Sequence, residues 1–196
     1  MRVVVIGASG IVGAAVADAL SEAHDVVRAS RRGNPRVDIG DPASIKRLFD
    51  AVPELDAVVC CAANAPLNTL SAQSDAQFRQ SVHAKLFGQI DVIRQGARHV
   101  RDHGSITVTS GAIPQGLEGA GAGALVNAGL EAFVRAVAPE MPRGIRVNAV
   151  SPGWVRESLE QLGMDPSEGT PAADVARAYV EAVAGTRTGE AIRPTR

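Results

Sequence analysis

Hydrophobic runs and amphipathic segments alternate from the first residues of the chain onward. Residues 3–6 are three valines and an isoleucine, a composition typical of a strand buried on both faces of a parallel sheet. From Ile11 onward, apolar residues recur at helical spacing, which predicts a helix that begins there. Glycines at positions 7, 10 and 13 separate the strand from the body of the helix. The opening of the sequence therefore predicts a strand, a tight turn and a helix.

The same alternation continues to the end of the chain. Further strands are predicted at residues 25–30, 55–61, 105–109, 145–150 and 189–192, with a short extended piece at 37–39. Helices are predicted at residues 42–50, with Asp41 as N-cap, and at 75–101, 124–138 and 171–184. Strands and helices that alternate with short links imply an α/β fold with a doubly wound parallel sheet in three layers, the Rossmann fold. We expect one domain over residues 1–196.

Composition narrows the classes of protein to which the chain can belong. Its 196 residues suffice for one three-layer domain and are too few for an additional large substrate domain. The 21 acidic and 20 basic residues nearly cancel, so neither a nucleic acid nor an anionic membrane is expected as a partner. No apolar run approaches the ~20 residues of a membrane span, and no signal-like segment precedes the first strand, so we expect a cytoplasmic protein. Adjacent Cys60 and Cys61 are expected as small buried apolar residues, with no metal site.

The three glycines of the first turn have separate roles in a turn that binds phosphate. Gly7 lets the chain reverse out of the strand, Gly10 lets backbone N–H groups approach a pyrophosphate, and Gly13 lets the helix lie close to the sheet. The pyrophosphate is then expected at the positive end of the helix. The alternative is a turn that only joins a strand to a helix. We predict a dinucleotide site with contacts from Gly7, Ser9, Gly10, Ile11, Val12 and Gly13.

The end of the second predicted strand selects the nucleotide in a dinucleotide-binding fold. A carboxylate there binds the ribose 2′-hydroxyl of NAD, whereas a cation accommodates the 2′-phosphate of NADP. Here Ser30, Arg31 and Arg32 stand together with no acidic residue beside them, which favours NADP over NAD. A solvated loop with surface arginines is the alternative. Because the ends of parallel strands line one crevice, further adenine or ribose contacts are expected at Asp38, Ile39, Ala62, Ala63 and Asn64.

Short segments along the chain agree in order and spacing with those of a known family. They are CCAAN at residues 60–64, KLFGQ at 85–89, GIRVNAVSPGWV at 144–155 and TGEAIR at 188–193. Together with the glycine turn, they resemble the short-chain dehydrogenase/reductase family across essentially the whole chain. The resemblance implies hydride transfer at the carbonyl or alcohol carbon of a small-molecule substrate. It also implies a Pro-Gly turn beside the nicotinamide, with cofactor contacts from Pro152, Gly153 and Val155.

The residues that transfer the proton in that family are only partly present. The family uses a tyrosine as general acid/base, a lysine that lowers the pKa of the tyrosine, a serine that positions the substrate oxygen and an asparagine that completes a proton relay. Ser110 matches the serine, and Lys85 stands where the asparagine is expected. Gly123 and Asn127 stand where the resemblance places the tyrosine and the lysine. Tyr179, the only tyrosine, lies in the last predicted helix and is expected to face the core or an interface.

Three hypotheses follow from this partial match. In the first, the protein is a reductase in which Lys85, Ser110, His83 or a water replaces the phenol, because a partly desolvated lysine has a lowered pKa and can donate a proton. In the second, it binds NADP(H) without turnover, as a sensor or an assembly subunit. In the third, it is a structural oligomeric module with an empty cleft. General acid–base catalysis contributes ~10²–10⁴-fold, so loss of the phenol need not abolish hydride transfer.

The resemblance also bears on the pocket and on assembly. Residues 154–169 correspond to the lid that shapes the substrate pocket in the family, and this segment is short, so a site open to solvent is expected. The predicted helices at 75–101 and 124–138 correspond to the pair that family members commonly use for subunit contacts. Because both helices carry apolar faces, we expect a homodimer or a homotetramer.

Overall fold

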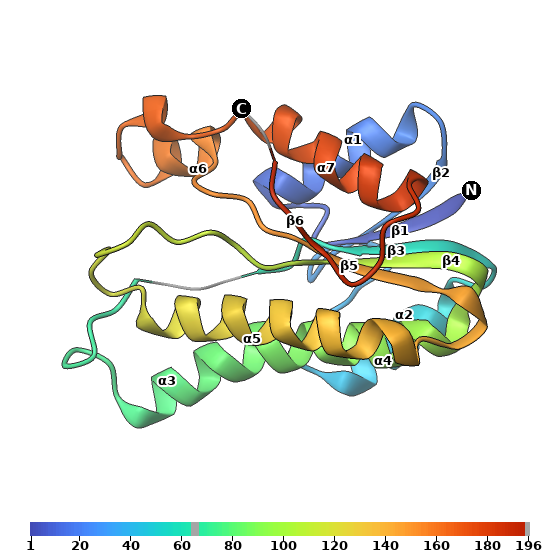
Figure 1. The fold of residues 1–196 in the computed structure, drawn as a ribbon, viewed down its shortest axis with the longest axis horizontal. Helices are drawn as coiled ribbons and strands as arrows, with labels where there is room; N and C mark the ends of the chain where they lie inside the picture. The colour runs from blue at the N-terminus through green and yellow to red at the C-terminus, as the bar shows by residue number, and fades with distance from the viewer. Residues whose placement is uncertain (64–66, 195–196) are drawn as a thin grey trace.

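Six parallel strands form one sheet in the computed structural model, which describes residues 1–63 and 67–194 (Figure 1). The strands are β1 (Arg2–Ile6), β2 (Asp25–Ala29), β3 (Leu55–Cys60), β4 (Val100–Thr109), β5 (Arg146–Val150) and β6 (Ala191–Ile192). They lie in the order β2-β1-β3-β4-β5-β6, so the direction in which the chain moves across the sheet reverses between β1 and β3. The predicted α/β fold with a doubly wound parallel sheet is confirmed, and ligands bind such sheets at the point of reversal.

Helices cover both faces of the sheet (Figure 1). On one face, α1 (Ile11–Ser21) packs against α7 (Ala172–Ala184), and α6 (Arg156–Gln161) lies on the same side. The other face carries α2 (Pro42–Ala51), α4 (Gly88–His99) and α5 (Gly121–Val137), with α3 (Asp75–Val82) beside α5. Short 3₁₀ turns lie at Ala138–Glu140, Pro142–Gly144 and Pro166–Glu168. In the part of the chain that the structure describes, none of the helices has the length and apolar character needed to cross a membrane.

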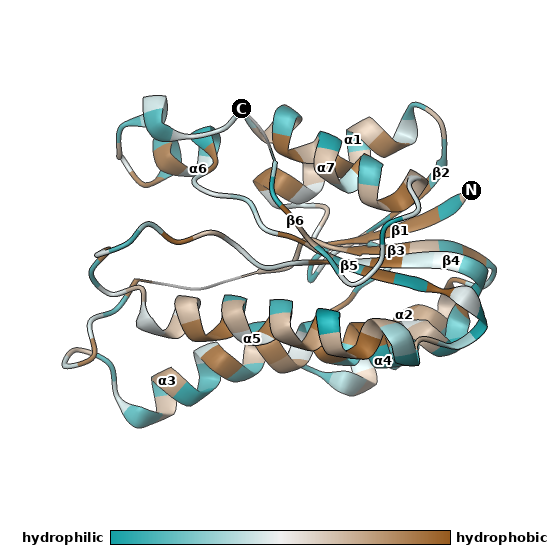
Figure 2. Cartoon of the chain, in the orientation of Figure 1, coloured by the Kyte–Doolittle hydropathy of each residue, from teal (hydrophilic) through white to brown (hydrophobic). Residues whose placement is uncertain are grey.

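The sheet is buried on both faces because successive strand residues belong to two different apolar clusters. Val4 lies in the cluster covered by α2, α4 and α5, whereas its neighbour Val3 lies in the cluster covered by α1 and α7. Figure 2 shows hydrophobic residues concentrated along the central strands and on the helix faces that meet them. Cys60 is fully buried in the first cluster, as predicted, whereas Cys61 packs against the second cluster and is only partly buried.

The chain between residues 75 and 104 differs from the predicted single helix. A π-helical turn, His83–Phe87, joins α3 to α4, and α4 ends two residues earlier than predicted. The two residues after α4 already belong to β4, which is ten residues long. Val100 pairs with Leu55 and Ser105 with Ala57, so β4 has extra residues between these two pairings. This irregular segment interrupts the alternation, and the pattern therefore predicts the strand only from Ser105.

Other predicted boundaries change less. α5 begins at Gly121, three residues earlier than predicted, so residues 121–123 belong to its first turn. Residues 37–39 form no strand, and in that loop only Arg36 makes a bridge, with Ser30. Asp41 caps α2 as predicted, because its Oδ1 accepts a backbone N–H of the first turn at 2.9 Å.

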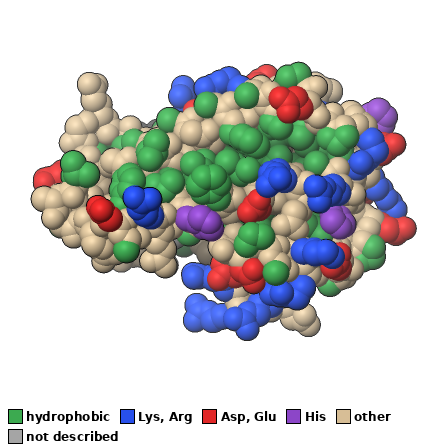
Figure 3. Space-filling model, turned by 90° about the horizontal axis from the view of Figure 1, so that it is seen from below, with side chains coloured by type: hydrophobic (Ala, Val, Ile, Leu, Met, Phe, Trp, Pro, Cys, Tyr) green, Lys and Arg blue, Asp and Glu red, His purple; other side chains and the backbone are tan. Residues whose placement is uncertain are grey.

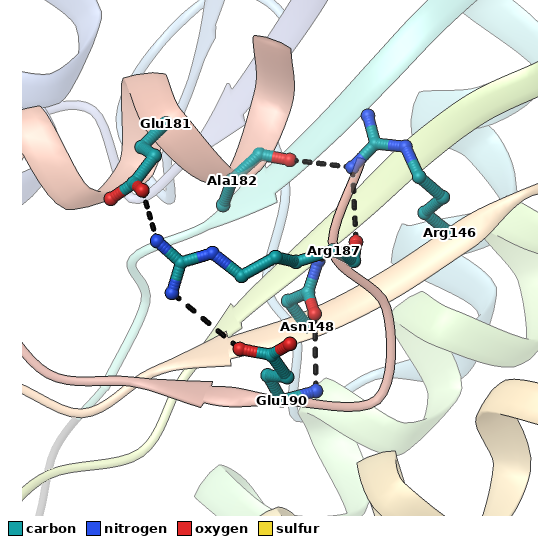
Figure 4. A network of polar contacts seen from close by, with 6 residues as sticks. All are labelled: Arg146, Asn148, Glu181, Ala182, Arg187 and Glu190. Carbon is teal, nitrogen blue, oxygen red and sulfur yellow. Dashed lines mark hydrogen bonds and ion pairs between the residues drawn. The ribbon is translucent and has the colours of Figure 1, made fainter. Parts of the chain in front are cut away.

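Polar contacts hold the last strand at the edge of the sheet (Figure 4). Arg146 on β5 donates to backbone carbonyl oxygens at the end of α7, and burial lowers the pKa of its guanidinium. Arg187 forms ion pairs with Glu181 and Glu190. Asn148 donates to the carbonyl oxygen of Arg187 at 2.8 Å and accepts the N–H of Glu190 at 3.1 Å. These contacts fix the loop between α7 and β6, and thereby the position of β6.

Apolar side chains also gather on one outer face of the molecule. Figure 3 shows hydrophobic atoms spread over the helical layer that contains α4 and α5 in Figure 1. Phe87, in the turn before α4, and Leu125, on α5, are each about half exposed. This helical layer therefore presents apolar surface to its surroundings as well as to the core.

Candidate functional site

The glycine turn between β1 and α1 leaves no room for a larger side chain at two positions. Gly7 has a φ of +87°, and a Cβ atom on it would lie 2.7 Å from the backbone nitrogen of Ala62. A Cβ atom on Gly13 would overlap the carbonyl oxygen of Gly7. The N–H groups of Gly7 and Ala8 both donate to the carbonyl oxygen of Ala29, at 2.8 and 3.2 Å, which ties the turn to the end of β2. The requirement for glycine at these positions is therefore steric.

The amino end of α1 is open to an anion. Gly10 is its N-cap, and no side chain among the described residues caps this helix. The N–H groups of Ile11, Val12 and Gly13 come before the first N–H that can bond within the helix. These groups and the helix dipole make the end of α1 electropositive. Ser9 and Gly10 line a cavity at this end of the helix.

The cavity has a volume of about 840 Å³ and lies at the carboxyl ends of β1, β2 and β3. Residues predicted to contact the cofactor form much of its wall: Gly7, Ser9, Gly10, Ser30, Arg31, Asp38, Ile39, Ala62 and Ala63. Other predicted contacts are not part of the wall: Ile11, Val12, Gly13, Arg32, Pro152, Gly153 and Val155. Asn64 lies outside the described residues. The structure thus gathers the residues predicted for the phosphates and the adenosine more completely than those predicted for the nicotinamide end.

The loop after β2 places one arginine at the cavity and one away from it. The carbonyl oxygen of Ser30 accepts the N–H of Val37 at 3.0 Å, which folds the intervening loop back at the strand end. Arg31 is exposed and lines the cavity, whereas Arg32 is exposed elsewhere. Among the residues that the structure describes, neither guanidinium forms an ion pair. Arg31 is therefore available to an anionic ligand at the position where a 2′-phosphate is expected. The carboxylate of Asp38 accepts a backbone N–H of its own loop at 3.0 Å.

Another part of the cavity wall is polar, and of its residues only His83 was named as a candidate from the sequence. It is formed by side chains of α3 and the segments on either side of it: Asn68, Gln73, Gln77, Gln80, Ser81 and His83. The sequence indicates only that this helix is amphipathic. Amphipathic spacing alone does not distinguish a polar face toward a cleft from a polar face toward water.

Lys85 lies in a second cluster of polar residues, next to the cavity. The π-helical turn points its side chain inward, and the residue is only 5% exposed. Its Nζ donates to the carbonyl oxygen of Ser110 at 2.9 Å and to Oδ1 of Asn127 at 2.7 Å. Nδ2 of Asn127 donates to the carbonyl oxygen of Gly111 at 2.8 Å, so its Oδ1 must face the ammonium. Ala84, the residue before Lys85, lines the cavity.

Burial controls the charge of this lysine. Desolvation lowers the pKa of Lys85 from the ordinary value of 10.5 to about 8, although the nearby Cys60 favours the charged form. An ammonium group has three N–H donors, and the described contacts use two of them. Lys85 therefore retains one N–H and gives up its proton more readily than an exposed lysine does.

Glu131 joins the two predicted site strands and was not predicted. The hydroxyl groups of Ser110 and Ser151 both donate to Oε1 of Glu131, each at 2.8 Å. The two serines directly follow β4 and β5, so one carboxylate of α5 holds both strand ends. Glu131 lies four residues after Asn127 on α5, and this spacing places both residues on one helix face. That spacing was the only sequence signal that could have found it.

Burial raises the pKa values of the tyrosine hydroxyl and of the two thiols near the cavity, although Cys61 is partly exposed and lines the cavity. The hydroxyl of Tyr179 is 2.7 Å from Oγ1 of Thr109, the residue is fully buried, and its pKa is raised well above the ordinary value by burial. It lies on α7, on the opposite side of the sheet from Lys85, and is a core residue as predicted. Burial also raises the pKa of the Cys60 thiol to about 12 and raises that of Cys61. In the described part of the chain, no group of three or more His, Cys, Asp and Glu side chains is placed to hold a metal ion.

Comparisons with known proteins agree with this fold. A family model described as enoyl-(acyl carrier protein) reductase matches residues 6–186. The structure of the protein lin1944 from Listeria innocua is 34% identical, covers 100% of both chains and has a TM-score of 0.93. A small-chain dehydrogenase is 30% identical over 98% of this chain and 95% of that chain, with a TM-score of 0.82. Another, solved in complex with NADPH, is 29% identical with the same coverage and a TM-score of 0.86. No match was found among curated proteins.

The sheet order, the glycine turn and the cleft at the strand ends define a protein with a Rossmann-type fold. Within that class, the match over residues 6–186 is decisive, and the chain belongs to the short-chain dehydrogenase/reductase family. The resemblance noted in the sequence is confirmed at this level.

Proposed function

We propose that the protein is an NADP(H)-dependent oxidoreductase that acts on the carbonyl or alcohol group of a small molecule, with Lys85 as proton donor. Membership of the family and a relative solved with NADPH support the reaction class and the cofactor. One observation carries the proposal: the Lys85 ammonium is buried beside the cavity, at the end of β4, and its pKa is lowered to about 8.

The cavity fits a phosphorylated dinucleotide in three respects. A side chain would fill the glycine cradle, the amino end of α1 has no side-chain cap among the described residues, and Arg31 has no ion-pair partner there. We expect the pyrophosphate at residues 7–13, the 2′-phosphate at Ser30 and Arg31, and the adenosine beside Asp38 and Ile39. When bound, NADPH supplies the hydride, and the protein binds it, orients it and provides the proton.

Lys85 can provide that proton. Its free N–H is a donor to a carbonyl oxygen, and a pKa near 8 allows the amine that remains after transfer to regain a proton from water at neutral pH. Its two contacts, to Ser110 and Asn127, hold the ammonium in one place, and a fixed donor contributes more than a mobile one.

An exchange of residues also favours this role. The family resemblance predicts an asparagine at position 85 and a lysine at position 127, and the chain has Lys85 and Asn127 in direct contact at 2.7 Å. The same two side-chain types therefore meet here, but the lysine comes from the turn between α3 and α4 and the asparagine comes from α5. We infer that the cation of the family site is retained here and comes from the α3–α4 junction instead of α5.

A second candidate, NADP(H) binding without turnover, is favoured by other observations. Lys85 and Ser110 are only 5% and 3% exposed, and neither is part of the cavity wall. The hydroxyl of Ser110 donates to Glu131 and not toward the cavity. In this role the protein would respond to the nucleotide as a sensor or as a subunit of an assembly.

We also propose that two or four copies of the chain associate through α4 and α5. The apolar surface over this helical layer, with half-exposed Phe87 and Leu125, is the support for this part of the proposal (Figure 3). The absolute mass in solution, measured by light scattering for the wild type and for Leu125→Glu, tests it. A monomeric wild type would contradict it.

The experiment that tests the function compares the only two lysines of the chain, Lys46 and Lys85. NADPH and NADH are titrated by fluorescence against the wild type, Lys85→Ala and the control Lys46→Ala. Lys46 is exposed and pairs with Asp50, outside the cavity. Oxidation of NADPH is then followed by absorbance with a panel of aldehydes and ketones.

The outcomes distinguish the reductase from the sensor. Turnover by the wild type and by Lys46→Ala, with a loss of about 10²-fold or more in Lys85→Ala and no change in NADPH affinity, supports the reductase. Binding of NADPH without turnover on the whole panel supports the sensor. Binding of neither nucleotide would contradict both.

A further inference from the structure

Glu131 is a charged side chain that contacts both strand ends of the site. Its Oε1 accepts the hydroxyl of Ser110, after β4, and the hydroxyl of Ser151, after β5, each at 2.8 Å. Both serines are almost completely buried, at 3% and 2% exposure, whereas Glu131 is half-buried. We propose that Glu131 is a positioning residue that fixes the Ser110 hydroxyl as a hydrogen-bond acceptor for a substrate hydroxyl. This inference rests on the proposed oxidoreductase function.

The direction of the hydrogen bond sets the chemistry of Ser110. A serine hydroxyl has one proton and two lone pairs, and an ionised carboxylate can only accept. The proton of Ser110 is therefore directed to Glu131, and the second nearby oxygen, the carbonyl of Val150 at 3.4 Å, is also an acceptor. Only lone pairs of Ser110 remain for a ligand. Ser110 can accept the O–H of an alcohol, but it cannot donate to a carbonyl oxygen in this arrangement.

Lys85 and Ser110 then have complementary roles toward the same substrate oxygen. Lys85 has only N–H donors, so it can bind a carbonyl oxygen, and Ser110 can bind the hydroxyl into which reduction converts that oxygen. The carbonyl oxygen of Ser110 accepts from Lys85 while its hydroxyl donates to Glu131, so a single residue links the two charged groups. The site therefore favours the alcohol form of the substrate through Ser110 and the carbonyl form through Lys85.

Two substitutions of nearly equal size separate positioning from packing. Glu131→Gln keeps an acceptor oxygen for both hydroxyl groups, and Glu131→Met has similar length without an acceptor. Ser151→Ala is the matched control, because it removes the second hydroxyl from the carboxylate and leaves the contact to Ser110. For each variant we measure thermal stability, NADPH affinity, a crystal structure, and kcat and KM for one alcohol and one carbonyl compound that the wild type converts.

We expect Glu131→Gln to retain the Ser110 orientation and to rescue turnover, and Ser151→Ala to retain the orientation. In Glu131→Met, we expect the Ser110 hydroxyl to turn away from α5 while NADPH affinity stays within about twofold. The KM for the alcohol should rise by about 10-fold or more, with a smaller change for the carbonyl compound, because one aligned hydrogen bond to the hydroxyl is lost. An unchanged Ser110 orientation in Glu131→Met, or equal changes of both KM values, would overturn the inference.

The crystal structures test the positioning role of Glu131 separately from the proposed oxidoreductase function. If the wild type converts no compound, the proposed function fails, and the Ser110 orientation in Glu131→Met still decides whether Glu131 positions the hydroxyl. If the wild type turns over and the orientation does not depend on Glu131, only the positioning role fails.

Discussion

Lys85 is a site residue whose charge should depend strongly on folding. Its pKa falls from 10.5 to about 8 in the folded chain because the side chain is buried. One pKa unit corresponds to about 1.4 kcal/mol, so the folded state disfavours the ammonium by about 3 kcal/mol. Between pH 8 and 10.5 the side chain of Lys85 binds more protons in the unfolded chain than in the folded one, so the contribution of Lys85 to the free energy of unfolding should rise with pH across this interval. The penalty is complete below pH 8 and absent above pH 10.5.

A single NMR signal can report this pKa. With Lys46→Arg, lysine labelled with ¹³C at Cε gives one resonance, that of Lys85, because the chain has no other lysine. We expect it to titrate near pH 8. The free energy of unfolding is measured by chemical denaturation for the wild type and for Lys85→Met at several pH values between 7 and 10.5. The value for the wild type minus the value for Lys85→Met should rise with pH by about 3 kcal/mol.

The refuting results are specific. A Lys85 resonance that titrates at or above 10.5, or a difference between the two proteins that does not change with pH, would show that burial does not destabilise the ammonium. The rate of carbonyl reduction gives an independent check. It should fall as pH rises through 8, because the donor loses its proton, and a rate that stays constant to pH 10 would exclude Lys85 as the donor.

Three further predictions concern the turn, the cofactor and the core. Gly13→Ala should lower the free energy of unfolding by about 1–3 kcal/mol and abolish NADPH binding, because the new Cβ overlaps the backbone of the turn. A variant that keeps both its stability and its NADPH binding would contradict the steric argument. Arg31→Ala should weaken the affinity for NADPH at least 10-fold in a fluorescence titration and leave the affinity for NADH almost unchanged. Arg32→Ala should have the smaller effect, because Arg32 lies away from the cavity. Equal losses of affinity for both nucleotides in Arg31→Ala would contradict the NADP preference. Tyr179→Phe should lower the free energy of unfolding by about 1 kcal/mol, because Thr109 loses a hydrogen-bond partner, and should leave the NADPH affinity unchanged. A loss of NADPH binding would contradict the assignment of Tyr179 to the core.

The sheet and the first turn could be predicted because their signals are local. The β-branched run of β1, the glycines and the spacing of α1 each specify one conformation, and neighbouring strands repeat the same pattern. The reversal of strand order follows from short right-handed connections. The start of β4 could not be predicted, because the irregular pairing after Val100 removes the alternation on which the prediction depends.

The candidate site was predictable only where strand ends define it. Arg31, Asp38 and Ala62 follow strands or the loops beside them, so their place at the cleft follows from the topology of parallel sheets. The contact between Lys85 and Ser110 depends on a π-helical turn, which hydropathy does not reveal. Glu131 was missed because a glutamate on an amphipathic helix has the same pattern whether it meets water or two buried serines.

The central claim is that the cradle of β1, the glycine turn and α1 holds the pyrophosphate of NADPH, with the reactive end directed toward Lys85. A crystal structure of the wild type soaked with NADPH tests it most directly. We predict density for the pyrophosphate at the amino end of α1, for the 2′-phosphate beside Arg31, and for the nicotinamide within reach of the Ser110 and Lys85 cluster. A nucleotide bound elsewhere, or a cavity that excludes NADPH at concentrations at which it binds the related dehydrogenase, would contradict the account.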